Sequence, residues 1–318
     1  MRTSVIILTK NNAATLDEVL GAVFRQDRSD ELEVIHIDSG STDDTLAIAE
    51  RYPCRRFRIA PSEFSHSATR NYAASLSQGE FVAYLSADAT PARPDWLHNL
   101  TAPLEDSSVA GVYGRQIPRP GAHVVEAYFL ERTYQAARRV KRLAPGRRIT
   151  LEDLFFSNVT SVIRKSAWRQ CPFDERLHMS EDQGWARDIL RAGYSLVYEP
   201  AAAVLHSHKY TFGQLFRRNF DSGHSLAVLI EGEDVSFLTY GAGFLLRELS
   251  EFAEDDHAGH LPALALYELV RATGFFLGRN AVRLPAEIRR RCSDYKLYWD
   301  RFGRSTVSSS RHRPAGLM

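Results

Sequence analysis

Short apolar runs alternate with amphipathic stretches along roughly the first two hundred residues. The runs TSVIILT, LEVIHID, EFVAYLS and VAGVYGR are rich in β-branched and aromatic residues, which is typical of buried strands. Between them, stretches such as ATLDEVLGAVFRQ and SATRNYAASLS repeat their apolar residues at helical spacing. Because strands that alternate with helices form mostly parallel sheets covered on both faces, the pattern predicts an α/β fold.

From about residue 211 the pattern becomes helical, as in FGQLFRRNF and LPAEIRRRCSDYKLYW. We predict an α/β domain over residues 1–210, a helical region over 211–300 and a disordered tail over 301–318, where the sequence is polar and aperiodic. The most apolar stretch, 261–278, is interrupted by Glu268 and Arg271. It predicts an amphipathic helix, since no uninterrupted apolar run approaches the roughly 20 residues of a membrane span.

The charge balance and the cysteines narrow the class of protein. With 40 basic and 39 acidic residues among 318, the chain lacks the basic excess of a nucleic-acid-binding protein. Its three cysteines, Cys54, Cys171 and Cys292, lie far apart, which predicts neither a disulfide framework nor a zinc site and fits a reducing compartment. The start, MRTSVIILTK, lacks a cleavage-like site and predicts a first strand. We therefore expect a cytoplasmic protein.

Two predicted strands end in a single acid. Asp38 closes the strand before IDSGSTDDT, and Asp88 follows the strand in YLSADATP. In open α/β sheets, ligands bind just outside the carboxyl ends of the strands. Helix capping accounts for residues 41–44 but not for Asp38, which precedes the turn. The absence of GxGxxG and GxxxxGK argues against an NAD enzyme or a P-loop ATPase.

A second pair of acids, Glu181 and Asp182, lies in SEDQGWARDILRAGY. Ser180 and Gln183 match a capping box, and acids are favourable in a first helical turn even when they are inert. A catalytic pair and a plain helix start therefore both remain open from the residues alone.

Two histidines follow a predicted strand in AVLHSHKY. On an extended segment His206 and His208 point to the same side. Such a pair is suggestive of a metal or phosphate contact, although alternate histidines are as often structural or exposed.

Taken together, TSVIILTKNN, IDSGSTDDT and the strand ending in SADATP resemble the nucleotide-sugar-binding half of family 2 glycosyltransferases. SEFSHSATRN, SEDQGWA and HSHKYTFGQLFRRNFDSG are similar to the bacterial rhamnosyltransferase branch of that family. The resemblance covers most of residues 3–225. It implies a GT-A fold, which is a Rossmann-like, mixed and mostly parallel sheet flanked by helices, with a helical region after it. Where other members carry D-x-D, this chain has Ser86, Ala87 and Asp88.

The resemblance also implies roles for individual residues. The nucleotide-sugar contacts would be Thr9, Asn11, Asp38, Ser39, Arg70, Asn71, Ser86 and Ala87. An ionised Asp38 suits the imide N–H of uracil or thymine, and the Arg70 guanidinium suits phosphate oxygens. Asp88 and His208 would bind Mg²⁺ or Mn²⁺, weakly unless the substrate supplies phosphate oxygens. Asp182, beside Glu181, would take the proton of the acceptor hydroxyl.

The activity implied is that of an inverting, metal-dependent glycosyltransferase acting in cell-surface polysaccharide synthesis. The expected donor is dTDP-L-rhamnose, with UDP-sugars as the alternative, and the expected acceptor is a saccharide or a lipid-linked saccharide. A sugar nucleotidyltransferase would need a glycine-rich basic loop in place of TKNNAAT, and a non-catalytic nucleotide-sugar-binding protein would not need the acid pair. We expect no nucleic-acid partner; peripheral contact with the inner face of the membrane, and a homodimer, both stay open for the helical region.

Overall fold

The computed structural model describes residues 2–27, 32–230, 252 and 258–302. The chain divides into two compact units, which we call the sheet unit and the helical unit. The sheet unit comprises residues 1–176 and 181–209, and the helical unit comprises 177–180 and 210–318. The tail predicted over 301–318 lies outside the described residues from 303 onward.

Within the described part of the sheet unit, nine strands form one mixed sheet in the order β3-β2-β1-β4-β8-β6-β9-β5, with β7 paired to β9. The neighbours β3, β2, β1 and β4 are parallel, as are β6 and β9, whereas β8 runs antiparallel between β4 and β6. The strands are β1 (Thr3–Thr9), β2 (Leu32–Asp38), β3 (Arg55–Arg58), β4 (Phe81–Leu85), β5 (Thr90–Pro91), β6 (Val109–Ile117), β7 (Arg139–Arg142), β8 (Thr160–Arg164) and β9 (Ser195–Leu205).

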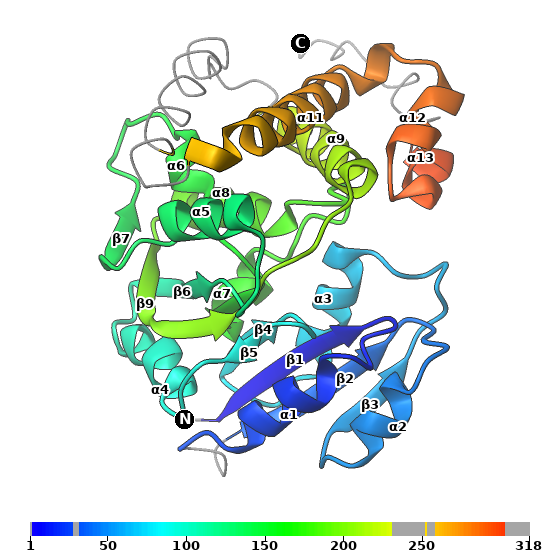
Figure 1. Ribbon diagram of the computed structural model, residues 1–318. Helices are drawn as coiled ribbons and strands as arrows, with labels where there is room; N and C mark the ends of the chain where they lie inside the picture. The colour runs from blue at the N-terminus through cyan, green and yellow to red at the C-terminus, as the bar shows by residue number, and fades with distance from the viewer. Residues whose placement is uncertain (1, 28–31, 231–251, 253–257, 303–318) are drawn as a thin grey trace, which may run out of the picture. The chain divides into compact units, whose positions relative to one another are not determined.

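Helices cover this sheet, and α1 and α2 lie along β1–β3 (Figure 1). Almost every position of β1, β2 and β4 is buried, as expected when helices cover both faces of a sheet. The helices are α1 (Leu16–Phe24), α2 (Thr45–Glu50), α3 (His66–Leu76), α4 (Trp96–Thr101), α5 (Val124–Thr133), α6 (Leu151–Leu154), α7 (Lys165–Gln170) and α8 (Glu181–Arg191), with a 3₁₀ turn η2 (Ala102–Glu105).

Strand register brings the predicted polar residues to one edge of the sheet. Thr9, at the end of β1, pairs directly with Asp38, at the end of β2. On the other side of β1, the parallel strand β4 ends at Leu85, so that Ser86 and Asp88 follow at the same edge. The parallel strands of the amino-terminal half therefore place the two strand-end acids at the carboxyl edge, where α/β proteins bind ligands.

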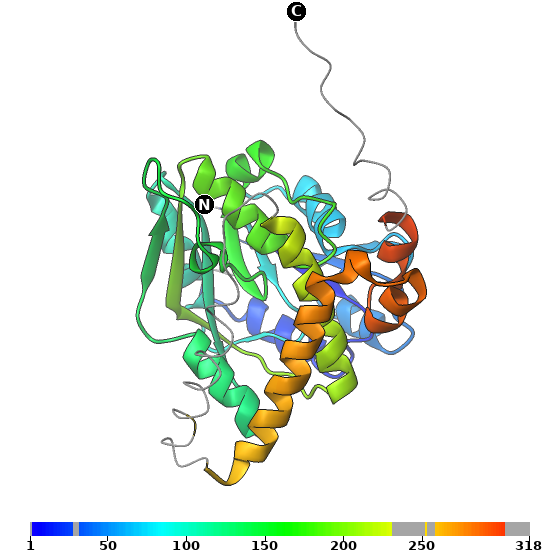
Figure 2. The same ribbon diagram turned by 90° about the horizontal axis from the view of Figure 1, so that it is seen from above.

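The helical unit is built around α9 and α11, which cross closely (Figure 2). Three glycines allow this approach: a Cβ at Gly278 would lie 1.8 Å from the Phe220 carbonyl oxygen, and Gly223 and Gly274 meet backbone in the same way. Thr211 and Gln214 form a capping box at the start of α9. The elements are α9 (Phe212–Leu229), η4 (Ala258–His260), α11 (Leu261–Arg279), η5 (Ala281–Arg283), α12 (Ala286–Cys292) and α13 (Lys296–Phe302).

Helix α11 forms over the apolar stretch in which the sequence predicted an amphipathic helix. By length and composition alone, it is long and apolar enough to cross a membrane, although core helices of soluble proteins pass the same test. Its charges are less disruptive than expected, because Glu268 is buried and forms an ion pair of 3.0 Å with Arg271 one turn away. Its exposed face instead carries large apolar residues, including Leu269 and Phe276.

Candidate active site

A cavity of about 250 Å³ opens at the carboxyl ends of β1 and β4. Its walls combine apolar strand ends with hydroxyl, amide and charged groups, as in sites for polar small molecules. The lining residues are Ile6, Leu8, Thr9, Lys10, Asn12, Ser39, Phe64, His66, Arg70, Tyr84, Leu85, Ser86, Ala87, Asp88 and Asn158.

The turn after β2 is organised around the buried carboxylate of Asp38. Its Oδ2 accepts hydrogen bonds from the amides of Gly40 and Ser41, both at 2.9 Å, while Oδ1 accepts from the hydroxyls of Thr9 and Ser41. Burial alone would raise the pKa of Asp38, but these donors outweigh it and lower the pKa below its usual range. Asp38 is therefore an ionised acceptor that fixes the turn beside the cavity.

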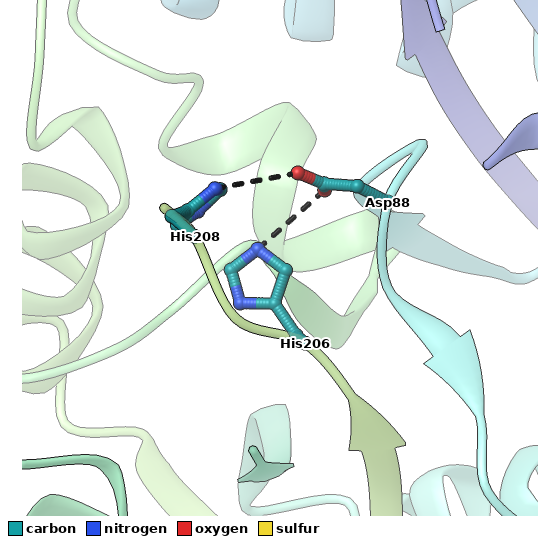
Figure 3. A group of neighbouring side chains, drawn as sticks. All are labelled: Asp88, His206 and His208. Carbon is teal, nitrogen blue, oxygen red and sulfur yellow. Dashed lines mark ion pairs between the residues drawn. The ribbon is translucent and has the colours of Figure 1, made fainter. Parts of the chain in front are cut away.

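Asp88 lies at the mouth of the cavity and faces two histidines (Figure 3). Its oxygens lie 3.5 Å from His206 Nε2 and 3.6 Å from His208 Nδ1, and these three ligand atoms lie within 4.8 Å of one another. Burial opposes ionisation of Asp88, but the hydrogen bond from His206 and the charges of both imidazoles lower its pKa to about 2. The cluster therefore presents one carboxylate and two imidazoles to a shared point, as a metal site requires.

Gln116 orients one of these imidazoles. Its Oε1 lies 2.8 Å from His206 Nδ1, while its Nε2 donates to Ser157 Oγ and to the Tyr134 hydroxyl. With the amide nitrogen donating to those two oxygens, Oε1 is the atom that accepts a hydrogen bond from His206 Nδ1–H. The other ring nitrogen, Nε2, faces Asp88 and would be the atom to bind a metal, which is how metal-binding histidines are held in proteins.

The acid pair lies at the start of α8. Arg70 forms an ion pair with Glu181, and the Asn158 side chain donates to the same Glu181 oxygen at 3.4 Å. The backbone amide of Asn158 donates to Asp182 Oδ2 at 3.1 Å. Since Asn158 and Arg70 also line the cavity, the acid pair and the cavity belong to one polar cluster.

The pKa values of the two acids are shifted in opposite directions. Burial would raise the pKa of Glu181, but the Arg70 guanidinium and His66 lower it. Burial and the neighbouring Glu181 charge raise the pKa of Asp182 to about 7, against smaller opposing contributions from Arg70 and the amides of Asn158 and Gln183. Such a separation of two neighbouring carboxyl groups is typical of catalytic pairs, and a pKa near 7 suits a general base.

The capping-box alternative does not describe this helix start. The Gln183 amide donates to Asp182 Oδ1 at 2.9 Å, and Ser180 has a left-handed φ of 58° instead of the extended backbone of a helix cap.

Comparison with known proteins identifies the family. A model described as glycosyl transferase family 2 matches residues 4–171. An O-antigen chain rhamnosyltransferase of Salmonella anatum is 31% identical over 288 residues, which cover 87% of this chain and 89% of that protein. The chain belongs to glycosyltransferase family 2. A second O-antigen chain rhamnosyltransferase, from Salmonella typhimurium, is 30% identical to this glycosyltransferase over 94% of the chain and 96% of that protein.

Solved structures confirm the predicted GT-A-like fold of the glycosyltransferase. A mannosyltransferase of Pyrobaculum calidifontis, solved with GDP-mannose and Mn²⁺, superimposes with a TM-score of 0.56 at 18% identity, covering 97% of this chain and 88% of that one. The Staphylococcus aureus protein TarS, solved with UDP, gives a TM-score of 0.52 at 19% identity, covering 89% and 91%.

The structure of this glycosyltransferase brings most of the predicted nucleotide contacts to the cavity. Those that line it are Thr9, Ser39, Arg70, Ser86 and Ala87, and the predicted metal ligand Asp88 lines it as well. Asp38 and Asn11 lie in the adjoining turns, where Asn11 Oδ1 accepts the Thr42 amide at 2.8 Å. Asn71 is bonded to the segment after α7: its side chain accepts from Trp168 Nε1 and donates to the Phe173 carbonyl, both at 2.9 Å. These three are not among the lining residues, so a direct nucleotide contact stays a prediction.

Three residues of the site escaped the sequence-based selection. His206 was recognised only as half of a same-side pair, although its Nε2 lies as close to Asp88 as His208 does. Gln116 comes from β6 and no local motif marks it, whereas Asn158, just before β8, lies in FFSNVTSVIRKSAW, a segment similar to the rhamnosyltransferase branch, but it was given no role. Their roles depend on partners more than 20 residues away in the chain, which a sequence pattern does not reveal.

Proposed function

We propose that this chain is an inverting, metal-dependent rhamnosyltransferase, which moves L-rhamnose from dTDP-L-rhamnose to a saccharide acceptor during cell-surface polysaccharide synthesis. The proposal rests on one observation above all: Asn158 lines the cavity and bonds both Glu181 and Asp182. The donor cavity and a carboxyl group with base-like properties therefore share one site. The choice of rhamnose is supported by the two O-antigen chain rhamnosyltransferases at about 30% identity.

Asp182 is the better base of the pair. Glu181 is held ionised by Arg70, which makes it a poor proton acceptor, whereas burial and Glu181 give Asp182 a pKa of about 7. In the reaction, Asp182 takes the acceptor hydroxyl proton as that oxygen bonds to the anomeric carbon. The bond from that carbon to the donor phosphate breaks on the opposite face, and dTDP leaves with the bonding electrons. A single displacement of this kind inverts the anomeric configuration.

Asp88, His206 and His208 fit a divalent cation. A bound Mg²⁺ or Mn²⁺ would supply charge that stabilises the departing diphosphate. Asp88, His206 and His208 would hold the cation, since their ligand atoms lie within 4.8 Å of one another. The two imidazoles favour Mn²⁺ over Mg²⁺, since Mg²⁺ prefers oxygen ligands. With only one carboxylate, the site should bind metal weakly until a diphosphate adds its oxygens.

The helical unit offers a surface for a lipid-linked acceptor. On α11, Leu266, Leu269 and Phe276 recur at helical spacing and are exposed by 44%, 64% and 66%. Arg289, Arg290 and Arg291 of α12 add positive charge to the same unit. An exposed apolar face together with basic residues is typical of helices that rest on anionic membranes. We propose that the protein is cytoplasmic and makes peripheral contact with the inner membrane face.

A thermal-shift panel tests the donor and the metal together. The purified protein is heated with dTDP-L-rhamnose, UDP-glucose, UDP-N-acetylglucosamine or GDP-mannose, each with Mn²⁺, Mg²⁺ or EDTA. We expect the largest rise in Tm with dTDP-L-rhamnose and Mn²⁺, a smaller rise in EDTA, and little effect of Mn²⁺ alone. A UDP-sugar that gives the largest rise would replace the rhamnose proposal, and tight binding of Mn²⁺ without nucleotide would contradict the substrate-completed metal site.

Two variants separate catalysis from binding. Asp182→Asn should abolish rhamnose transfer while the donor-induced Tm shift is retained. Asp88→Asn should remove the part of that shift which depends on Mn²⁺. If Asp182→Asn transfers sugar at the parent rate, Asp182 is not the base, and a non-catalytic protein would show donor binding without transfer in every variant.

A further inference from the structure

The chain passes from the helical unit to the sheet unit immediately before the acid pair. Residues 177–180 belong to the helical unit, whereas Glu181 begins α8 of the sheet unit. Two residues, Met179 and Ser180, separate His178 from Glu181. His178 is therefore joined by a short covalent link to the backbone from which the acid pair begins.

His178 is held by side chains of α9 and α13. Its Nε2 lies 3.4 Å from Asp221 Oδ1, its Nδ1 lies 3.4 Å from Ser225 Oγ, and its ring stacks on Tyr298 with 4.1 Å between the centroids. Asp221 is fully buried and also accepts hydrogen bonds from Ser293 Oγ and the Asp294 amide. We call His178, Asp221, Ser225 and Tyr298 the His178 cluster. The imidazole packs against this carboxylate and on Tyr298, although its Nε2 makes no hydrogen bond to Asp221, whose hydrogen bonds come from Ser293 and Asp294.

Ser225 contacts His178, which in turn contacts Asp221, as in the triad of a hydrolase. A hydrolytic role is excluded because the serine is not accessible to a substrate. All three side chains are buried, and Ser225 is only 1% exposed. A nucleophile must reach a substrate carbonyl, and this hydroxyl has no exposed surface to offer. The cluster is therefore better explained by what it holds in place.

Two further features restrain the residues between His178 and the acid pair. The Ser222 hydroxyl donates to Met179 Sδ at 3.0 Å, and Leu177 is buried. Ser180 adopts a left-handed φ of 58°, which a residue with a side chain keeps only when its surroundings impose it. Every residue from 177 to 180 is thus restrained, either by α9 and α13 or by its backbone conformation.

We propose that the His178 cluster is a positioning device, through which the helical unit sets the placement of Asp182 by way of residues 178–181. The inference rests on the proposed role of Asp182 as base. His178 does not touch the reacting atoms, so it is a positioning residue. Its effect should be large for its distance, because displacement of a base by about 1 Å can cost on the order of 100-fold in rate. The nucleotide cavity is lined by residues up to 158 and should be unaffected.

The test compares His178→Ala, His178→Gln and the matched control Leu264→Ala. The control removes a fully buried side chain from α11 in the same unit but leaves the His178 cluster intact. With the full chain, we expect His178→Ala to lower kcat by about 10- to 100-fold and to leave the donor KM within about twofold. His178→Gln, whose amide can donate to Asp221, should recover most of the loss. Leu264→Ala should keep the parent kcat at a temperature well below its Tm.

The pH profile of kcat gives a second readout. If the backbone before α8 is released in His178→Ala, Asp182 gains water, and the rising limb of the profile should move to lower pH; Leu264→Ala should not move it. A parent-like kcat in His178→Ala, or an equal loss in Leu264→Ala, would overturn the proposal. If His178→Ala does not fold, Asp221→Asn takes its place under the same criteria. If Asp182→Asn keeps the parent turnover, Asp182 is not the base, whatever the His178 variants show.

Discussion

Replacement of Asp182 by Asn should remove activity and at the same time change how stability depends on pH. Burial and Glu181 raise the pKa of Asp182 from 3.8 to about 7 in the folded protein. Between about pH 4 and pH 7, the folded chain therefore holds a proton that the unfolded chain has released. Because the folded state binds more protons in this window, the free energy of unfolding falls as the pH rises through it, and the loss is complete above about pH 7.

The magnitude follows from the same numbers. Each pH unit between the folded and unfolded pKa corresponds to about 1.4 kcal/mol, so the gap from 3.8 to about 7 is worth at most about 4 kcal/mol. Because the titrations of Glu181 and Asp182 are coupled, we expect about half or more of this free energy to be lost when Asp182 alone is replaced. Asn cannot ionise, so the free energy of unfolding of the variant does not fall with pH in this way. The variant is instead destabilised at every pH by about 1–3 kcal/mol, because the Asn amide nitrogen would face a backbone N–H of Asn158 or Gln183.

We would measure the free energy of unfolding by urea titration at 25 °C. The signal is the fluorescence of tryptophans such as Trp185 of α8, which is buried. The difference in unfolding free energy, Asp182→Asn minus parent, should grow by about 2–3 kcal/mol between pH 4.5 and pH 8. Asp153→Asn is the control: burial opposes ionisation there, but bonds from Arg147 and Thr150 lower the pKa of Asp153, so its contribution changes only below about pH 4 and the difference should stay constant between pH 4.5 and pH 8. A difference for Asp182→Asn that stays constant with pH, as in the Asp153 control, would refute the reasoning.

Other expectations concern the metal cluster, the helix crossing and the pH profile. Gln116→Leu should weaken Mn²⁺ binding in the presence of dTDP by about 10- to 100-fold in calorimetry, because His206 Nδ1 loses its acceptor; unchanged affinity would remove Gln116 from the site. Gly278→Ala should lower the free energy of unfolding by about 1–3 kcal/mol or more, since its methyl would lie 1.8 Å from the Phe220 carbonyl oxygen; an unshifted circular-dichroism melt would argue against the crossing. In the parent, kcat should rise about tenfold from pH 6 to pH 8 as Asp182 ionises, and Glu181→Gln should move this rise to lower pH; a flat profile would exclude Asp182 as the base.

The placement of the strand-end acids could be predicted from the sequence. A parallel strand places its last residue at a known edge, so Asp38 and Asp88 could be assigned to the carboxyl edge from hydrophobic pattern, whereas Thr9 was chosen by family resemblance; the strand register brings Thr9 beside Asp38. The same pattern predicted the helical change near residue 211, after which α9 and α11 follow.

The side chains that tune the site were beyond the reach of local pattern. His206 and His208 share one side of an extended segment, but only Gln116, 90 residues earlier, shows which nitrogen of His206 is available. Asn71 directly follows Arg70 in SEFSHSATRN, and both were predicted to contact the nucleotide sugar. Adjacent residues on a helix point in different directions, and the side chain of Asn71 instead bonds to Trp168. In α11 the two ionised residues that interrupt the apolar stretch, Glu268 and Arg271, form an ion pair with each other, which the sequence alone did not show.

The choice between Glu181 and Asp182 shows why a pair of adjacent acids can do what neither does alone. Two carboxylates side by side repel, and without Arg70 both would resist ionisation. Arg70 comes from α3 and pairs with Glu181 alone, so one negative charge is held permanently beside Asp182. That fixed charge, together with burial, keeps the proton affinity of Asp182 high enough for it to accept a proton near neutral pH. On the proposed assignment of Asp182 as the base, Arg70 acts on that base through Glu181, and a neutral replacement of Arg70 should change the ionisation of both acids.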